Sequence, residues 1–250
     1  MLRVGHKGAA ALEPENTLRS LERAVELGVD VVEFDVLDLR DGTVVLAHSD
    51  DLFEVSHGAA TGRVRSKSLE ELRRAARDLP TLDEALAFFA ERAPETGVQV
   101  DLKWHGFEGP VVAALSRHGL VQRAVVSSFH AHSLRAVRAL DPSLATGLTY
   151  PYDRYYLSRR RPLTPVLLGA MLALRRTLPA RIGGLLRRAG ASVAMLHHSV
   201  VSPAVVRAAH AVDAPVVAWT VDDPRELDRV VRSGVDAVTT NDPRIFGTRL

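Results

Sequence analysis

The chain has 250 residues, about the length of one α/β barrel, and 46% of them are hydrophobic, enough for a sizeable buried core. Charged residues make up 25%, which excludes a disordered acidic or basic tail, and a net charge of +2 gives nucleic-acid binding no support. The absence of cysteine excludes disulfides, thiolate metal ligands and cysteine nucleophiles.

The sequence shows no targeting or membrane-spanning signal. Residues 1–6 lack the long apolar run of a signal peptide. The longest uncharged apolar stretch, residues 163–174, is shorter than the roughly 20 residues that cross a bilayer. We therefore expect a soluble, cytoplasmic protein.

Short runs of β-branched residues alternate with helical patterns along the whole chain. This alternation is typical of βα units that build a parallel sheet. Eight runs suit a closed (β/α)₈ TIM barrel: residues 3–6, 29–35, 98–103, 124–128, 145–148, 192–197, 216–220 and 237–240. An extra strand, residues 43–47, is expected after the turn at Asp41-Gly42. Two helices between these strands begin with capping boxes, Ser68 with Glu71 and Thr81 with Glu84.

No linker, low-complexity stretch or repeat interrupts the pattern, so we expect residues 1–250 to form one barrel domain. The connection after the fifth barrel strand, about residues 151–190, is an insertion far longer than a simple βα step. Residues 154–188 hold nine arginines and no acidic residue, and residues 165–174 predict an apolar helix. The insertion is either a basic cap that makes a peripheral membrane contact or meets long phosphodiesters, or a solvated helical excursion packed on the barrel rim.

Acidic side chains occur where two neighbouring barrel strands are expected to end. Glu33 and Asp35 are two residues apart, so both point to the same face of their strand, and Asp101 and Lys103 repeat this spacing. Three convergent carboxylates favour a hard cation such as Mg²⁺ or Ca²⁺. The alternative is that these acids form salt bridges with Lys103 and Arg40.

Two histidines form a second candidate pair. His6 closes the first strand, and His48 follows the extra strand. Two imidazoles near a metal could share general-base and general-acid duties, because their usual pKa lies near neutrality. Taken singly, each histidine could equally be a packed or surface residue.

An ordered set of motifs runs from His6 to Pro243. They are His6-Lys7-Gly8, Pro14-Glu15-Asn16-Thr17, Glu33-Phe34-Asp35, Asp41-Gly42, Val45-Leu46-Ala47-His48, Pro80-Thr81-Leu82-Asp83-Glu84, Asp101-Leu102-Lys103, Ser127-Ser128-Phe129, Trp219-Thr220-Val221-Asp222 and Gly234 to Pro243. In this order they resemble the motifs of the glycerophosphodiester phosphodiesterase family. The resemblance implies metal-dependent hydrolysis of a small-molecule glycerophosphodiester to an alcohol and glycerol 3-phosphate.

The resemblance also implies a role for each site residue. His6 and His48 would be the acid–base pair, and Glu33, Asp35 and Asp101 would bind the divalent metal. Lys7 and Lys103 would neutralise phosphoryl oxygens, and Trp219 would form an apolar wall for the glycerol moiety. Glu15 and Asn16 would support the first loop.

The chain departs from the family pattern at three positions. Lys7 replaces an arginine, Asp101 replaces a glutamate, and Ser49 follows His48 where an aspartate is usual. Lysine contacts phosphate as a point charge without the bidentate fork of arginine. Two alternatives therefore stay open: a lysophospholipase D-type lipid phosphodiesterase with the insertion as acyl-chain site, and a catalytically weak barrel that binds phosphodiesters or lipid headgroups.

Overall fold

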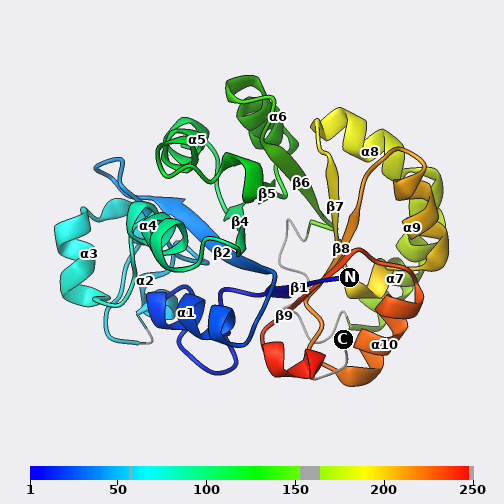
Figure 1. The fold of residues 1–250 in the computed structure, drawn as a ribbon, viewed down its shortest axis with the longest axis horizontal. Helices are drawn as coiled ribbons and strands as arrows, with labels where there is room; N and C mark the ends of the chain where they lie inside the picture. The colour runs from blue at the N-terminus through cyan, green and yellow to red at the C-terminus, as the bar shows by residue number, and fades with distance from the viewer. Residues whose placement is uncertain (57, 153–163, 248–250) are drawn as a thin grey trace.

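The protein is a (β/α)₈ barrel, as the alternating sequence pattern predicted. The structure is a computed structural model and describes residues 1–56, 58–152 and 164–247. In this part of the chain, eight parallel strands close into a barrel, because β1 pairs with both β2 and β9 (Figure 1). These strands are β1 (Leu2–Gly5), β2 (Val31–Asp38), β4 (Gly97–Leu102), β5 (Ala124–Ser128), β6 (Ala145–Tyr150), β7 (Val193–His197), β8 (Val216–Trp219) and β9 (Ala237–Thr240).

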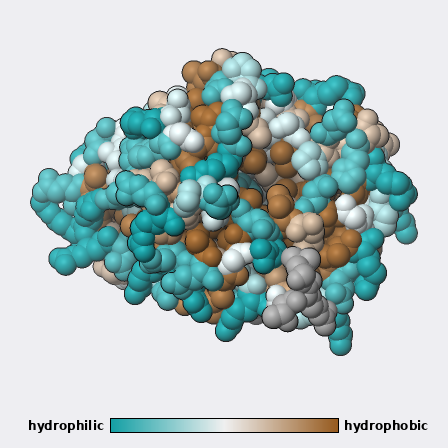
Figure 2. All heavy atoms as spheres, viewed as in Figure 1, coloured by the Kyte–Doolittle hydropathy of each residue, from teal (hydrophilic) through white to brown (hydrophobic). Residues whose placement is uncertain are grey.

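Helices surround the barrel on its outside (Figure 1). They are α1 (Leu18–Glu26), α2 (Leu52–Val55), α3 (Leu69–Ala75), α4 (Leu82–Arg92), α5 (Glu108–Arg117), α6 (Ala131–Leu140), α7 (Thr164–Thr177), α8 (Ile182–Ala189), α9 (Pro203–His210) and α10 (Pro224–Arg232). Both predicted capping boxes form, at the first turns of α3 and α4. On the face shown in Figure 2, apolar side chains are visible around the centre and polar ones cover much of the periphery.

The second strand is longer than the sequence predicted. We expected it to end at Asp35, but β2 continues to Asp38 because β3 (Val44–Leu46) pairs with it in antiparallel register. Glu33 and Asp35 consequently lie in the middle of β2 rather than at its end. The hairpin turn contains Gly42 at φ +83°, a conformation that suits glycine, and Thr43 N–H donates to Asp41 Oδ1 over 3.0 Å.

The main core lies between the barrel wall and the helices. Val32, Phe34 and Val36 alternate with the acidic residues along β2, and the Phe34 ring stacks on Phe89 of α4 at 6.0 Å. The apolar positions of β2 therefore face the helices, and its acidic positions face the barrel interior. On the opposite side the interior is apolar, where Met195 and Val217 pack together.

The connection between β6 and β7 contains α7, a short 3₁₀ helix (Leu178–Ala180) and α8. The predicted apolar helix at residues 165–174 lies within α7, whereas the arginines at positions 154 and 159–161 lie outside the described residues. Met171 and Leu174 pack against the helical core, but Leu172 is 59% exposed. None of the helices in the described ranges combines the length and apolarity needed to cross a membrane.

Candidate active site

Three carboxylates meet inside the barrel on β2 and β4. Asp35 and Asp101 are directly paired in the parallel register of the two strands, and Glu33 lies two residues before Asp35 on the same face. All three are almost fully buried, and one oxygen of each lies within 4.8 Å of the others. The strand register thus gathers the predicted ligand residues in one place.

Lys103 bridges two of these acids. Its Nζ lies 2.7 Å from Asp35 Oδ1 and 2.7 Å from Asp101 Oδ2, so this part of the salt-bridge alternative also occurs. Arg40, by contrast, pairs with Glu71 and takes no part. Burial alone would lower the pKa of Lys103, but the charges of Asp101 and Asp35 outweigh it and hold this pKa above its usual value.

One ammonium cannot neutralise three buried carboxylates. Burial, and then the charge of Asp35, hold the pKa of Glu33 well above its usual value. Burial also disfavours the charged form of Asp35, but Lys103 outweighs it and keeps the pKa of Asp35 below its usual value. Asp35 Oδ1 is buried, and its partner is the same Lys103 ammonium that also serves Asp101. An all-oxygen set with this unmet charge fits a divalent hard cation.

A hydrogen-bonded chain orients His6, which directly follows β1. Asn241 Nδ2 donates to Asp222 Oδ2 over 2.6 Å, so the amide oxygen of Asn241 faces His6 Nδ1 at 2.7 Å. Nδ1 therefore carries the proton, and Nε2, 3.9 Å from Glu33 Oε2, presents a lone pair. Burial, followed by the charge of Lys7, lowers the pKa of His6 to about 4, so the ring is neutral at neutral pH.

The β2–β3 hairpin positions His48 near His6 and the carboxylates. The Ala47 N–H donates to the Asp35 carbonyl over 3.0 Å, which fixes the residue before His48 against β2. His48 Nδ1 lies 3.4 Å from Glu54 Oε1. His6 and His48 both line one cavity of about 150 Å³ together with Glu33, Asp101 and Lys103.

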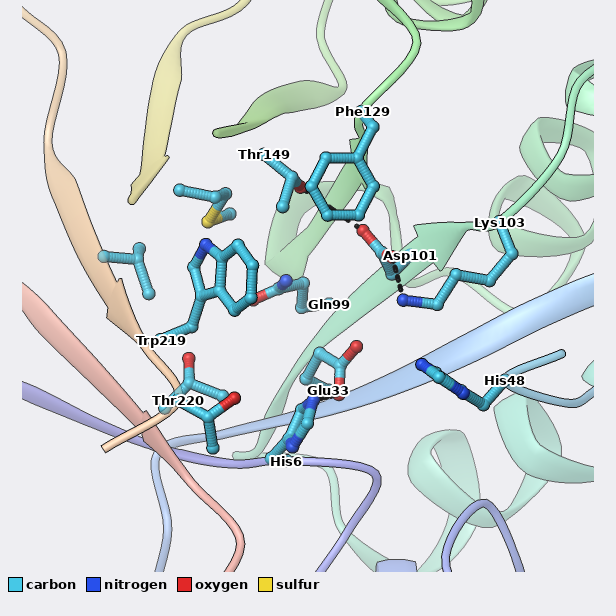
Figure 3. Close-up of a pocket in the computed structure, with 13 residues that line it drawn as sticks. His6, Glu33, His48, Gln99, Asp101, Lys103, Phe129, Thr149, Trp219 and Thr220 are labelled. Carbon is cyan, nitrogen blue, oxygen red and sulfur yellow. Dashed lines mark hydrogen bonds and ion pairs between the residues drawn. The ribbon is translucent and has the colours of Figure 1, made fainter. Parts of the chain in front are cut away.

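The cavity has a charged side and an apolar side (Figure 3). In this view Trp219 lies across the cavity from Lys103 and His48, and the rings of Trp219 and Phe129 meet edge to face at 6.0 Å. Trp219 Nε1 is buried and has no hydrogen-bond partner among the described residues. The arrangement suits a small ligand with one anionic and one apolar part.

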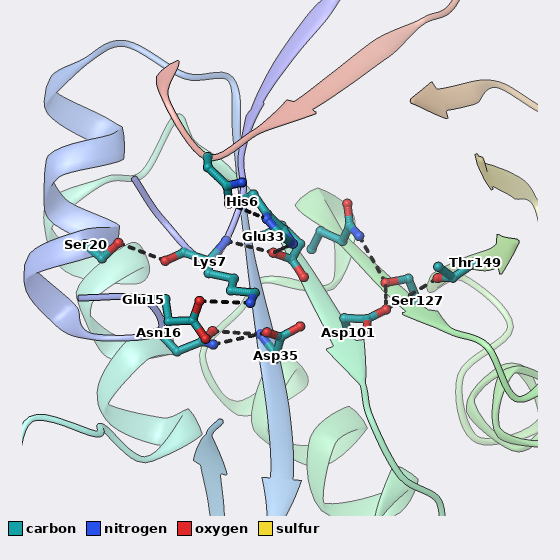
Figure 4. Close-up of polar contacts among 12 residues, drawn as sticks. His6, Lys7, Glu15, Asn16, Ser20, Glu33, Asp35, Asp101, Ser127 and Thr149 are labelled. Atoms are coloured by element: carbon teal, nitrogen blue, oxygen red, sulfur yellow. Dashed lines mark hydrogen bonds and ion pairs between the residues drawn. The ribbon is translucent and has the colours of Figure 1, made fainter. Parts of the chain in front are cut away.

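The first loop supports the acids through one side chain and one backbone N–H (Figure 4). Asn16, at φ +58°, donates from Nδ2 to Asp35 Oδ2 over 3.1 Å and accepts from the Asp35 N–H over 3.0 Å. The Lys7 N–H donates to Glu33 Oε2 over 2.8 Å. The ammonium of Lys7, however, pairs with Glu15 at 2.9 Å, and Lys7 is absent from the described residues that line the cavity.

Several site residues had no role in our sequence-based predictions. Ser127 Oγ donates to Asp101 Oδ1 over 2.5 Å, and Gln99 Nε2 donates to Ser127 Oγ over 3.1 Å. Gln99 could have been found, since it stands two residues before Asp101 and shares its face. Thr149 and Asn241 could not, because only barrel closure and strand register bring them to the site.

Comparisons with known proteins agree with this geometry. The sequence model of the "Glycerophosphoryl diester phosphodiesterase family" matches residues 6–245. The chain is 25% identical to a glycerophosphodiester phosphodiesterase of Caldanaerobacter subterraneus, covering 96% of this chain and 93% of that one. It is 29% identical to an Arabidopsis thaliana glycerophosphodiester phosphodiesterase, covering 96% of this chain and 70% of the relative.

Solved structures show the same fold. A glycerophosphodiester phosphodiesterase from Agrobacterium tumefaciens superposes with a TM-score of 0.76 at 20% identity, covering 98% of each chain. An Oleispira antarctica phosphodiesterase in complex with sn-glycerol-3-phosphate superposes with a TM-score of 0.72 at 23% identity, covering 98% of this chain and 94% of that one. The chain therefore belongs to the glycerophosphoryl diester phosphodiesterase family, whose members are phosphoric diester hydrolases.

Proposed function

We propose that the protein hydrolyses glycerophosphodiesters to an alcohol and glycerol 3-phosphate, with His6 and His48 as the acid–base pair and a divalent metal on Glu33, Asp35 and Asp101. The observation that carries the proposal is that both imidazoles and the carboxylate cluster border one small cavity. The apolar wall that includes Trp219 would receive the glycerol moiety.

The three carboxylates would hold Mg²⁺ or Ca²⁺, both of which prefer oxygen ligands. When bound, such an ion supplies positive charge that stabilises the phosphoryl oxygens in the transition state. Lys103 would add its own charge to the same oxygens. Lys7 would contribute from further away, because its ammonium is held by Glu15.

The two histidines suit different proton transfers. His6 is neutral, its Nδ1 proton is held by Asn241, and its free Nε2 can accept a proton from water or a substrate hydroxyl. His48 is the second imidazole that lines the cavity, so it is left to donate a proton to the leaving alkoxide. We therefore assign His6 as general base and His48 as general acid.

An assay of glycerol 3-phosphate release from glycerophosphodiesters with different alcohols tests this function. We expect His6→Ala and His48→Ala each to lower turnover by about 10²–10⁴-fold, as is typical for a positioned acid or base. His118→Ala is the matched control, since this ring pairs with Asp83 on the surface. Unchanged turnover in either active-site variant would refute its assignment. Binding of the diester without turnover would favour a binding barrel instead.

Metal binding is tested without an activity readout. Mg²⁺ or Ca²⁺ should raise the melting temperature of the purified protein, because a ligand that binds only the folded state stabilises it. The metal-dependent increase should disappear in Glu33→Ala and persist in His118→Ala. An equal increase in Glu33→Ala would rule out the carboxylate site.

One observation favours a lipid substrate as the second candidate. Leu172 on α7 is exposed, and Arg175 and Arg176 follow it in the last turn of that helix. Such a surface suits a peripheral contact with anionic lipid and a lysophospholipase D-type activity. Faster turnover of lysophospholipids than of water-soluble glycerophosphodiesters would support this candidate. No preference for anionic over neutral vesicles in co-sedimentation at low salt would exclude the membrane contact.

A further inference from the structure

Three histidines cluster at the rim of the barrel, outside the carboxylate site. His105 lies in the loop between β4 and α5, while His130 is the N-cap residue of α6 and His132 lies in its first turn. The ring centres are 4.9 Å apart for His105 and His132, 5.5 Å for His130 and His132, and 6.0 Å for His105 and His130.

These distances have the dimensions of a tri-histidine metal site. A zinc–nitrogen bond of about 2.0–2.1 Å places each ring centre about 3.2 Å from the ion, so tetrahedral geometry separates ring centres by about 5.2 Å. The measured separations fall within about 1 Å of that value. The backbone thus already holds the three rings at the required spacing.

The three rings must rotate before they can coordinate one ion. Among the described residues, only the interior carboxylates bring their ligand atoms within 4.8 Å of one another, so the nitrogens of the three histidines do not yet converge. The rings of His105 and His132 meet at 74°, and those of His105 and His130 at 79°. His105 and His132 are exposed, and none of the three rings has a hydrogen-bond partner among the described residues. Side chains can turn between staggered rotamers without breaking any hydrogen bond of these rings.

Burial favours the neutral form of one of these rings, and a neutral ring is the form that binds metal. Burial, followed by the charges of His132 and His105, lowers the pKa of His130 below its usual value. The buried carboxylate of Glu108 accepts from the Gly106 N–H over 2.9 Å and interacts electrostatically with His132. A carboxylate beside ligating histidines is the usual support of such a site.

We propose that His105, His130 and His132 form a second metal site that takes a transition-metal ion such as Zn²⁺. Imidazole ligands suit Zn²⁺, Ni²⁺ or Cu²⁺, whereas the interior carboxylates suit Mg²⁺ or Ca²⁺, so the two sites select different ions. The bound ion ties the β4–α5 loop to the start of α6. It also fixes the position of Phe129, the cavity-lining residue directly before His130.

Titration with Co²⁺ or Zn²⁺ in the presence of saturating Mg²⁺ tests the site. The intact protein should bind one Co²⁺ with the visible absorption of a tetrahedral nitrogen-ligated ion, and Zn²⁺ should displace it. His105→Ala and His132→Ala should each weaken Zn²⁺ binding by about a hundredfold or more, measured by calorimetry. Because both side chains are exposed, the melting temperature without metal should stay unchanged.

Two controls separate this site from the carboxylate site. Glu33→Ala removes an interior ligand and should leave Zn²⁺ binding intact, and His118→Ala removes a surface histidine outside the cluster. Failure of the intact protein to bind stoichiometric Co²⁺ or Zn²⁺ would overturn the proposal. Binding that survives in both His105→Ala and His132→Ala would overturn it equally.

Discussion

At the scale of single residues, the site depends on side chains that are not among the described residues lining the cavity. The His6 ring is held through Asn241, which is held in turn by two contacts with Asp222, over 2.6 Å and 2.8 Å. Asn16 holds Asp35 in a similar way through two hydrogen bonds. These amides set which nitrogen of His6 carries the proton and which way the Asp35 carboxylate faces.

Asn241→Ala tests this positioning role. Without the acceptor beside Nδ1, His6 can adopt the other tautomer, and we expect kcat to fall about 10-fold to 100-fold with little change in KM. Steady-state kinetics would measure the change, and thermal unfolding would check that the barrel remains folded. A kcat equal to that of the intact protein would show that His6 is oriented by other contacts.

At the scale of elements, the β2–β3 hairpin and α4 together place His48. Val45 of β3 bridges to Thr81, and the Leu46 N–H donates to the Pro80 carbonyl over 2.9 Å. Thr81 also begins α4, where its Oγ1 accepts from the Glu84 N–H over 3.1 Å and Glu84 Oε2 accepts in return over 2.8 Å. The start of this helix is therefore joined to the strand that carries a catalytic candidate.

Thr81→Ala should lower both stability and activity. Loss of an N-cap hydroxyl typically costs about 1 kcal/mol of unfolding free energy, which urea denaturation can measure. Ser68→Ala removes the same type of cap from α3 and is the matched control. Both variants should lose stability, but turnover should fall further in Thr81→Ala because the disturbed turn adjoins β3. Equal turnover in Thr81→Ala and Ser68→Ala would show that the start of α4 does not help to position His48.

At the scale of the whole molecule, stability should depend on pH through a half-buried histidine. His197 packs on Trp219 with ring centres 5.1 Å apart, and its Nδ1 accepts from the Ser199 N–H. Burial, followed by the charge of His198, lowers the pKa of His197 to about 4 in the folded protein. The unfolded chain, with a pKa near 6.5, binds a proton more readily between these values.

The direction of the pH dependence follows from the difference between the folded and unfolded pKa values of His197. Stability from His197 is fully present above about pH 6.5 and is lost as the pH falls toward 4, with up to about 2 kcal/mol lost between pH 7 and pH 5. In His197→Gln this contribution disappears, so urea unfolding with chelator at both pH values should show a smaller decrease than in the intact protein. Parallel decreases in the two proteins would contradict the assignment.

The fold was predictable because local sequence patterns indicate the strands and helices of a TIM barrel. Alternating strand and helix signals, capping boxes and i, i+2 acidic pairs depend on residues close together in the chain. They were sufficient for the barrel and for the shared face of Glu33 and Asp35. The end of β2 was misplaced because its last three residues owe their strand conformation to pairing with β3.

The sequence by itself determined the barrel, the family motifs and the residue types available for chemistry. Tertiary structure decided which of them meet. Barrel closure brings Asn241 to His6, the register of β2 against β4 pairs Asp35 with Asp101, and Glu15 pairs with the ammonium of Lys7. Contacts between residues distant in the chain depend on strand register and on closure of the barrel. Local sequence patterns do not specify which distant residues these two features bring together.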